Sequence, residues 1–168
     1  TLPATPMMAP EKSISFDVRP GEILGIAGID GNSQKQLAEA LAGQRPVTAG
    51  SIQLNGAELM SRNQAERRAL GLRYLTDDRL GEGTVGAFAV ATNFFLKEIG
   101  HEPLWRRGIE QRRVIATRAG SLVKQYDVRT PSVHTPAGRL SGGNIQKLII
   151  ARELVDGARV IIFNKPTY

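Results

Sequence analysis

The chain has 168 residues, a size that fits one domain with a substantial core. Hydrophobic residues make up 41 %, glycine occurs 18 times and cysteine is absent, which fits an α/β protein and excludes disulfides and thiol chemistry. The net charge of +6 favours an acidic partner or a membrane surface, whereas the aromatic content of 5 % disfavours a base-stacking surface for nucleic acid.

The first third of the chain predicts strands, turns and one helix. Residues 1–12 are expected to form a leader. Residues 14–18 alternate between apolar and polar types, as a half-buried strand does, and residues 23–27 predict a short buried strand. The dipeptide Pro20-Gly21 predicts a turn between them. Residues 28–31 predict a second turn before a helix.

That helix is expected over residues 36–43 and ends at a glycine cap. Residues 51–56 predict a strand that runs into an Asn-Gly turn, typical of a hairpin. A charged helix over residues 61–70 and a strand over residues 71–75 follow. No apolar run in the chain reaches the length of a membrane span.

The remainder predicts a helical insert and a return to the core. Residues 85–138 are mostly helical and rich in arginine, residues 143–155 predict a helix and residues 160–163 an apolar strand. The expected organisation is a leader (1–12), an α/β core with a β part (13–84), a helical subdomain (85–138) and a segment that returns to the core (139–168).

A stretch of small and polar residues precedes the last helix: Leu140-Ser141-Gly142-Gly143-Asn144-Ile145-Gln146-Lys147. Ser141 can cap that helix, and its hydroxyl can donate a hydrogen bond to an anion. Gly142 and Gly143 let backbone N–H groups approach a phosphate without a Cβ in the way. The N-terminus of the helix adds about half a positive charge. The stretch predicts an anion-binding surface, and an ordinary serine-capped helix is the alternative.

A second stretch has the spacing of a phosphate-binding loop without its side chains. That loop reads Gly, four residues, Gly, Lys, then Ser or Thr, between a strand and a helix. Counted from Gly28, Ser33 replaces the second glycine, Gln34 the lysine and Lys35 the hydroxyl residue. The backbone could still hold a phosphate, whereas the cation on the phosphates and the Mg²⁺ ligand are lost. The expected nucleotide-binding residues are Gly28, Gly31, Asn32, Ser33, Gln34, Lys35 and Gln36, and a strand-turn-helix unit without a ligand is the alternative.

The stretch before the last helix resembles the signature motif of ABC-transporter ATPases, in the form that sugar and nucleoside importers use. The altered phosphate loop resembles that of the second ATPase domain of such importers. The resemblance implies an α/β fold with a P-loop NTPase core, an antiparallel β edge and a helical subdomain. It also implies a signature motif that completes the ATP site of a partner domain, made of Leu140, Ser141, Gly142, Gly143, Asn144 and Gln146.

Other segments carry the same resemblance. Residues 160–167 are similar to a Walker B strand that ends in Asp-Glu-Pro-Thr, so that Asn164 stands at the Mg²⁺-linked aspartate and Lys165 at the catalytic glutamate. A charged lysine cannot act as a general base. Residues 74–79 are similar to a segment that places Asp77 near the Q-loop position, and residues 90–93 to the start of the family's helical subdomain.

The arginines of the insert are expected to form a solvated face, and docking on a membrane domain or on lipid headgroups is the alternative. They are Arg106, Arg107, Arg112, Arg113 and Arg118, beside Trp105.

By this resemblance the chain is the nucleotide-binding domain of a sugar or nucleoside importer, cut at both ends, with no intact catalytic residue. The implied cofactors are ATP and Mg²⁺, the metal weak or absent at the chain's own site. The implied partners are a second ABC ATPase domain, fused or separate, transmembrane permease subunits and, indirectly, a substrate-binding protein; nucleic acid is not expected. The implied location is peripheral, on the cytoplasmic face of the cell membrane.

Two other functions stay open at this stage. Lys35 weakly favours a self-sufficient ATPase, which Gln34, Asn164 and Lys165 oppose. The net charge permits a basic module that binds nucleic acid, but no RNA or DNA motif supports it. The isolated chain is expected to be inactive as an ATPase.

Overall fold

A computed structural model describes residues 14–29, 33–155 and 157–165. The chain divides into two units, residues 1–32 and residues 33–168, and each is described by itself. In the first unit, residues 14–29 contain the turn predicted at Pro20-Gly21, where Gly21 has φ 79°, but no helix or strand.

The strands predicted over residues 14–18 and 23–27 are therefore wrong. All the side chains of residues 14–29 are exposed, with Ile23 at 97 %. A strand is stable only where a neighbouring strand takes its hydrogen bonds and its apolar side chains find a surface to pack on. Alternating hydrophobicity shows that a segment could use such a surface, but not that one is present.

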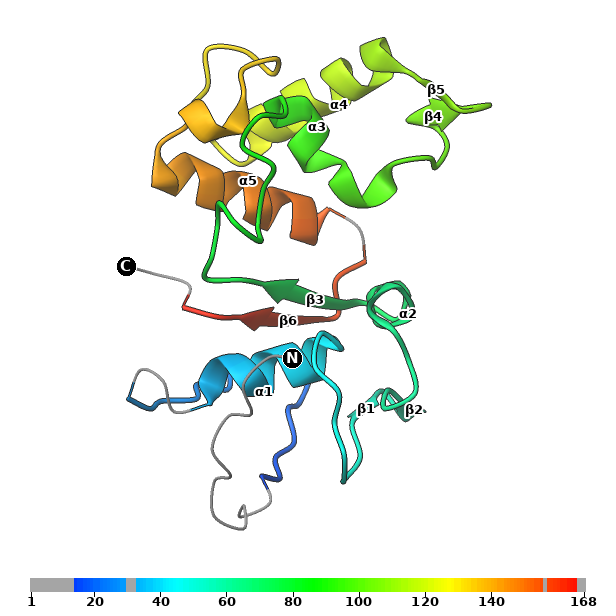
Figure 1. The fold of residues 1–168 in the computed structure, drawn as a ribbon, viewed down its shortest axis with the longest axis vertical. Coiled ribbons are helices and arrows are strands. Elements are labelled where there is room, and N and C mark those ends of the chain that lie inside the picture. The colour runs from blue at the N-terminus through cyan, green and yellow to red at the C-terminus, as the bar shows by residue number, and fades with distance from the viewer. Residues whose placement is uncertain (1–13, 30–32, 156, 166–168) are drawn as a thin grey trace, which may run out of the picture. The chain divides into compact units, whose positions relative to one another are not determined.

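A parallel pair of strands forms the centre of the second unit. Strand β3 (Leu72–Leu75) pairs with β6 (Val160–Phe163), and their register places Leu72 opposite Val160. Figure 1 shows helix α1 (Gln34–Ala42) on one face of this pair and helix α5 (Gly142–Leu154) on the other. Both strands are confirmed as predicted, and the layers are those of an α/β core.

An antiparallel hairpin lies beside this core. Helix α1 ends at Gly43 (φ 78°), as predicted, and strands β1 (Gln53–Leu54) and β2 (Ala57–Glu58) pair in antiparallel fashion. Asn55 and Gly56 join them with φ of 50° and 79°, the left-handed conformations that an Asn-Gly turn adopts readily.

Helix α2 (Gln64–Ala69) is shorter than predicted. The side chain of Asn63 accepts a hydrogen bond from the Glu66 backbone, and Glu66 accepts one from the Asn63 backbone, so this capping box sets the first turn. Arg67 is buried, and its Nη1 donates to the Ala40 and Leu41 carbonyls at 2.9 and 2.7 Å. These contacts satisfy the C-terminal end of α1 and hold that helix in place.

Residues 85–139, which we call the helical part, contain several helices, and the subdomain bounds of 85–138 stay a prediction. The helical part contains helices α3 (Val90–Phe94) and α4 (Arg112–Gln125) and the short 3₁₀ helices η1 (Leu96–Glu98) and η2 (Ala137–Arg139). Helix α3 packs on α4 and α5 through a buried cluster that includes Val90, Phe94, Ile115, Ala119 and Leu148. A hairpin of β4 (Trp105–Arg106) and β5 (Ile109–Glu110) was not predicted, because strands of two residues are too short to show an alternating pattern.

A buried carboxylate joins the helical part to the core. Glu153, near the end of α5, is fully buried, and its oxygens accept hydrogen bonds from Arg68 at 2.7 Å, Lys97 at 2.7 Å and Arg152 at 2.9 Å. Burial alone would raise the pKa of Glu153, but the positive charges of Lys97, Arg152 and Arg68 hold it below its ordinary value. These cations come from α2, η1 and α5, so one carboxylate connects three helices.

We expect Glu153→Gln to lower the free energy of unfolding by about 3 kcal/mol, because it leaves buried cations without their counter-charge. Glu110→Gln is the matched control and should cost less than about 0.5 kcal/mol, since its partner Arg112 is 88 % exposed. Urea denaturation measures both.

The pH dependence gives an independent check on Glu153. Because its folded pKa is lowered, its contribution is complete above the ordinary value of 4.5 and is lost as the pH falls through the folded value. The difference in stability between wild type and Glu153→Gln should therefore shrink below about pH 4.5. A difference that stays constant down to pH 3 would contradict the assigned ion pairs.

Candidate functional site

The exposed beginning of helix α5 carries the predicted anion-binding stretch. Ser141 is the N-cap residue, and Ser141, Gly142 and Gly143 are exposed, as expected. The Ser141 side chain makes no capping hydrogen bond; its Oγ instead accepts one from Asn144 Nδ2 at 2.9 Å. Because Oγ is the acceptor there, the hydroxyl hydrogen can still be donated to an external anion.

Contacts from two neighbouring segments fix the beginning of this helix. The Arg129 backbone N–H donates to Asn144 Oδ1 at 2.7 Å, and Arg79 Nη1 donates to the Gly142 carbonyl at 3.2 Å. One turn further, Lys147 Nζ lies 2.6 Å from Asp127 Oδ2 and lowers the pKa of that carboxyl. The exposed surface is therefore held in one geometry from several sides.

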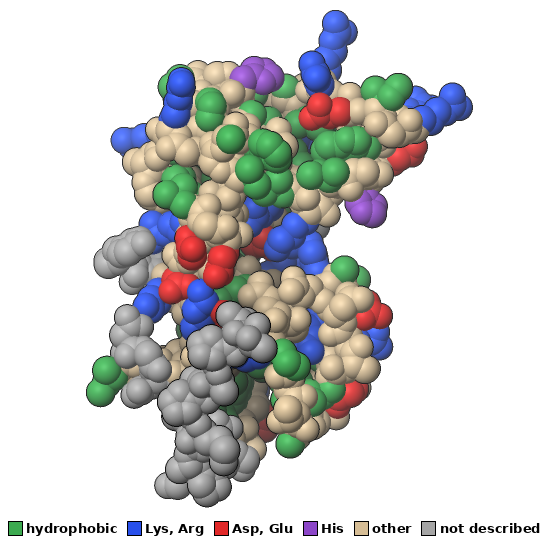
Figure 2. All heavy atoms as spheres, in the orientation of Figure 1, with side chains coloured by type: hydrophobic (Ala, Val, Ile, Leu, Met, Phe, Trp, Pro, Cys, Tyr) green, Lys and Arg blue, Asp and Glu red, His purple; other side chains and the backbone are tan. Residues whose placement is uncertain are grey.

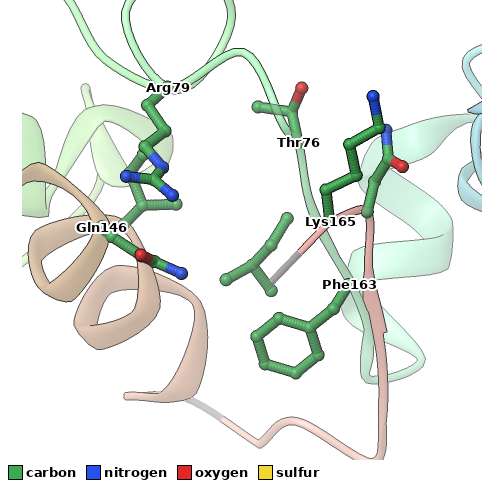
Figure 3. Close-up of a pocket in the computed structure, with 8 residues that line it drawn as sticks. Thr76, Arg79, Gln146, Phe163 and Lys165 are labelled. Carbon is green, nitrogen blue, oxygen red and sulfur yellow. The ribbon is translucent and has the colours of Figure 1, made fainter. Parts of the chain in front are cut away.

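Two residues of the predicted signature motif face the interior of the protein. Leu140 is only 9 % exposed and belongs to the hydrophobic core. Gln146 and Arg79 line a small pocket, together with Thr76, Phe163 and Lys165 (Figure 3). The pocket measures about 10 Å³, which leaves room for one water molecule at most. Leu140 and Gln146 thus support the exposed turn from within the protein.

The altered phosphate loop is described only in part. Gly31 and Asn32 lie outside the described residues, and Gly28 is an exposed residue of the first unit. In the second unit, Ser33 is the N-cap of α1 with φ 65°, and Gln34, Lys35 and Gln36 form the first turn of the helix. Ser33 stands at the second-glycine position and has the left-handed conformation that favours glycine.

The other altered positions lie together at the carboxyl ends of β3 and β6. Asn164 is 8 % exposed, and its Nδ2 donates to Asp77 Oδ1 at 2.9 Å. Lys165 Nζ lies 3.8 Å from Asp77 Oδ2, and Lys35 Nζ lies 3.6 Å from Asp77 Oδ1. Four residues that were singled out separately in the sequence, Lys35, Asp77, Asn164 and Lys165, therefore lie together. With Glu82 they form one group, which we call the lysine cluster.

Glu82 is the member of the lysine cluster that the sequence reading missed. Its Oε1 accepts a hydrogen bond from Lys35 Nζ at 3.0 Å, and its Oε2 accepts one from Thr76 Oγ1 at 2.5 Å. The bond to Glu82, with the charge of Asp77, raises the pKa of Lys35. The only sequence signal was the number of acidic residues between positions 77 and 82.

The lysine cluster does not fit Mg²⁺. Magnesium takes oxygen ligands in octahedral geometry, yet the carboxylates of Asp77 and Glu82 are already in contact with lysine ammonium groups. A divalent cation would lie beside two positive charges. In the part of the chain that the structure describes, no group of three His, Asp or Glu residues could hold a metal ion.

A family comparison decides the identity of this arrangement. The model of the family described as "ABC transporter" matches residues 12–168, nearly the whole chain. The chain belongs to the ABC transporter family. We call the exposed start of α5, residues 141–144, the signature turn, after the motif that it resembles.

Curated relatives narrow the resemblance within the ABC family. The guanosine import ATP-binding protein NupO of Bacillus subtilis is 37 % identical over 156 residues, which are 93 % of this chain and 31 % of that protein. The ribose import ATP-binding protein RbsA 3 of Rubrobacter xylanophilus is 41 % identical over 155 residues, which are 92 % of this chain and 30 % of that protein. The chain therefore spans less than a third of these relatives.

Solved structures agree on the fold. The ATP-binding cassette MJ0796, in a dimeric post-hydrolysis state bound to ADP and Pi, matches with a TM-score of 0.71 at 18 % identity. The match covers 91 % of this chain and 64 % of that one. At this identity the likeness supports the ABC ATPase fold alone.

In the absence of nucleotide, Mg²⁺ should not change the Tm of the wild-type chain. The comparison is with a sodium salt of equal ionic strength. A triple variant replaces the two ammonium groups by oxygen ligands: Lys35→Ser, Asn164→Asp, Lys165→Glu. The Tm of this variant should rise when Mg²⁺ is added. At about ten times its Kd, the ion stabilises by about 1.4 kcal/mol, or about 3–6 °C in Tm. A Mg²⁺-specific shift in the wild type would show that the lysine cluster does not exclude the metal.

Proposed function

We propose that this chain is the nucleotide-binding domain of a sugar or nucleoside importer, whose signature turn completes the ATP site of a partner ATPase domain while its own site does not hydrolyse ATP. One observation carries the proposal. The signature turn is exposed and rigidly held, whereas the chain's own catalytic positions are occupied by the lysine cluster. The names of the relatives, import ATP-binding proteins for guanosine and ribose, support the class of cargo.

The signature turn is built to bind a phosphate. The first helical hydrogen bond of α5 runs from Ile145 N–H to the Ser141 carbonyl at 2.9 Å, so the N–H groups of Gly142, Gly143 and Asn144 precede it and point out of the helix. These N–H groups and the Ser141 hydroxyl are donors at the positive end of a helix of 13 residues. If the partner domain holds a nucleotide, these donors would orient its γ-phosphate and stabilise the charge of that phosphate.

The chain's own site lacks the groups that phosphoryl transfer needs. Lys165 is a cation where a base would polarise water, and Asn164 uses its amide to donate to Asp77 rather than to bind a metal. Lys35 forms ion pairs with Asp77 and Glu82. Its positive charge is therefore neutralised and is not available to a phosphate. These contacts oppose the alternative of a self-sufficient ATPase.

The implied assembly follows from the proposed role. A second ABC ATPase domain, fused or separate, would hold the nucleotide that the signature turn contacts. Transmembrane permease subunits and a substrate-binding protein would complete the importer, with this chain on the cytoplasmic face of the membrane. Within the residues that the structure describes, no helix is long and apolar enough to cross a bilayer.

The isolated chain should release phosphate from ATP no faster than the buffer does. The physical reason is the absence of a metal ligand and of a base at Lys35, Asn164 and Lys165. A phosphate-release assay with and without Mg²⁺ measures this, with an intact ABC ATPase as positive control. Turnover well above background that disappears in Lys35→Ala would support the self-sufficient ATPase instead.

Gly142→Asp should abolish ATP turnover when the protein, carried in its complete coding sequence, is paired with an ATPase domain whose phosphate loop is intact. The new carboxylate would face the partner's γ-phosphate and repel it, with an expected loss of at least about 100-fold. The substitution fits the fold, because a Cβ at Gly142 meets only Arg79 Nη1 at 3.6 Å. An acidic residue in the first turn of a helix is also favourable.

Gln34→Ala is the matched control, since it alters the chain's own loop and should change turnover by less than about 2-fold. Circular dichroism and Tm should be the same for both variants. Equal losses in the two variants, or a silent Gly142→Asp, would refute the proposed use of the signature turn.

A further inference from the structure

The unpredicted β4–β5 hairpin lies in a positively charged segment of the chain. Residues 101–118 hold five arginines against two glutamates, which is half of the net charge of +6 in about a tenth of the chain. We call residues 105–113 the arginine hairpin. Figure 2 shows basic side chains projecting at the upper right, where β4 and β5 lie in Figure 1.

The turn of the arginine hairpin contains an arginine in an unfavourable backbone conformation. The register pairs Arg106 with Ile109, so Arg107 and Gly108 form a two-residue loop with φ of 52° and 76°. Loops of this kind favour Asn, Asp or Gly at the first position, because a larger side chain is strained at positive φ. Asparagine at position 107 would make the turn more stable. The arginine there therefore points to a role for its charge.

The side chains around this turn form a shallow binding surface. Arg106, Arg107 and Ile109 are exposed, Ile109 at 67 %, and with Gln111 they line a hollow of about 370 Å³. Arg112 is paired with Glu110 at 3.4 Å. Within the described ranges, Arg106 and Arg107 make no ion pair, so their guanidinium groups are available to an external anion.

The hairpin is firmly attached to the helical part. Leu104 is fully buried, and Trp105 packs against the same hydrophobic cluster that holds α3, α4 and α5 together. The Gln111 backbone N–H donates to the Leu104 carbonyl at 2.9 Å and closes the base of the hairpin. The exposed arginines are therefore presented on a fixed support.

We propose that the arginine hairpin binds the phosphate headgroups of an anionic lipid bilayer, with Ile109 entering the interface. The proposal rests on the proposed function, which places the chain beside a membrane. Guanidinium groups bind lipid phosphates, and an exposed aliphatic side chain between them gains by leaving water at the headgroup level. Nucleic acid would use aromatic side chains for stacking, and Trp105, the aromatic residue of the hairpin, is packed against the core.

Co-sedimentation of the full chain with vesicles tests this surface. Binding should be stronger to vesicles of phosphatidylcholine and phosphatidylglycerol in equal parts than to phosphatidylcholine alone, and should weaken with salt. Arg107→Asn should lower the affinity for the anionic vesicles about 5-fold, while Tm stays unchanged or rises because asparagine suits positive φ. Ile109→Ser should weaken binding without any change of charge.

Lys124→Asn is the matched control, because it removes the same charge from the exposed last turn of α4. That position lies roughly 18 Å along the helix from Arg112, and the change should leave vesicle binding within about 1.5-fold. Equal losses for Arg107→Asn and Lys124→Asn would overturn the proposal in favour of a diffuse charge effect, as would equal binding to both kinds of vesicle. A loss of oligonucleotide affinity in Arg107→Asn with vesicle binding unchanged would assign the surface to nucleic acid.

These readouts involve neither ATP nor a partner domain. A silent Gly142→Asp together with hairpin-dependent vesicle binding would refute the proposed function and leave the lipid surface standing. The converse result would refute the lipid surface alone.

Discussion

The ion pairs of the buried Glu153 carboxylate connect the parts of the second unit to one helix. Arg68 reaches it from α2, Lys97 from η1 and Arg152 from α5 itself. Arg152 also donates to the Gly83 carbonyl at 2.9 Å, which fixes the loop that follows β3. Because a buried charge is stable only when paired, these four side chains determine where the C-terminal end of α5 lies against the core and the helical part.

The other end of α5 carries the signature turn. A helix is stiff over 13 residues, so its N-terminus is positioned by what holds its C-terminus. The Arg79 contact to the Gly142 carbonyl and the Arg129 contact to Asn144 then set the local geometry of the exposed turn. The same helix therefore links an inner electrostatic anchor to an outer surface suited to phosphate.

In the proposed function, the chain's own nucleotide site is neutralised by its own side chains. In an intact site, acidic side chains hold a metal ion and the metal holds the phosphates. Here Lys35 and Lys165 supply positive charge directly to Asp77 and Glu82, and the Asn164 amide donates to Asp77. The carboxylates are satisfied without a ligand, which is consistent with a domain that serves its partner's nucleotide.

Local signals in the sequence were enough for the elements whose geometry is local. Gly43 ends α1, Asn55-Gly56 makes the hairpin turn, and an exposed serine and two glycines stand at the start of α5. The predicted replacements in the phosphate loop and at the Walker B end stay a prediction that rests on residue type and spacing. Segments 14–18 and 23–27 were misread, since alternation shows only what a strand could bury.

Only the tertiary structure decided which distant side chains meet. Lys35 and Glu82 are 47 residues apart, and Asn164 and Asp77 are 87 apart, yet each pair is hydrogen bonded. Arg68 and Glu153 are separated by 85 residues, and no pattern around either one indicates the other. The strained Arg107 turn was equally hidden, because backbone conformation at one residue follows from the pairing of its neighbours. The sequence by itself determined the family, whereas charge pairing and surface presentation arose from packing, which brings together residues that no short window of sequence contains.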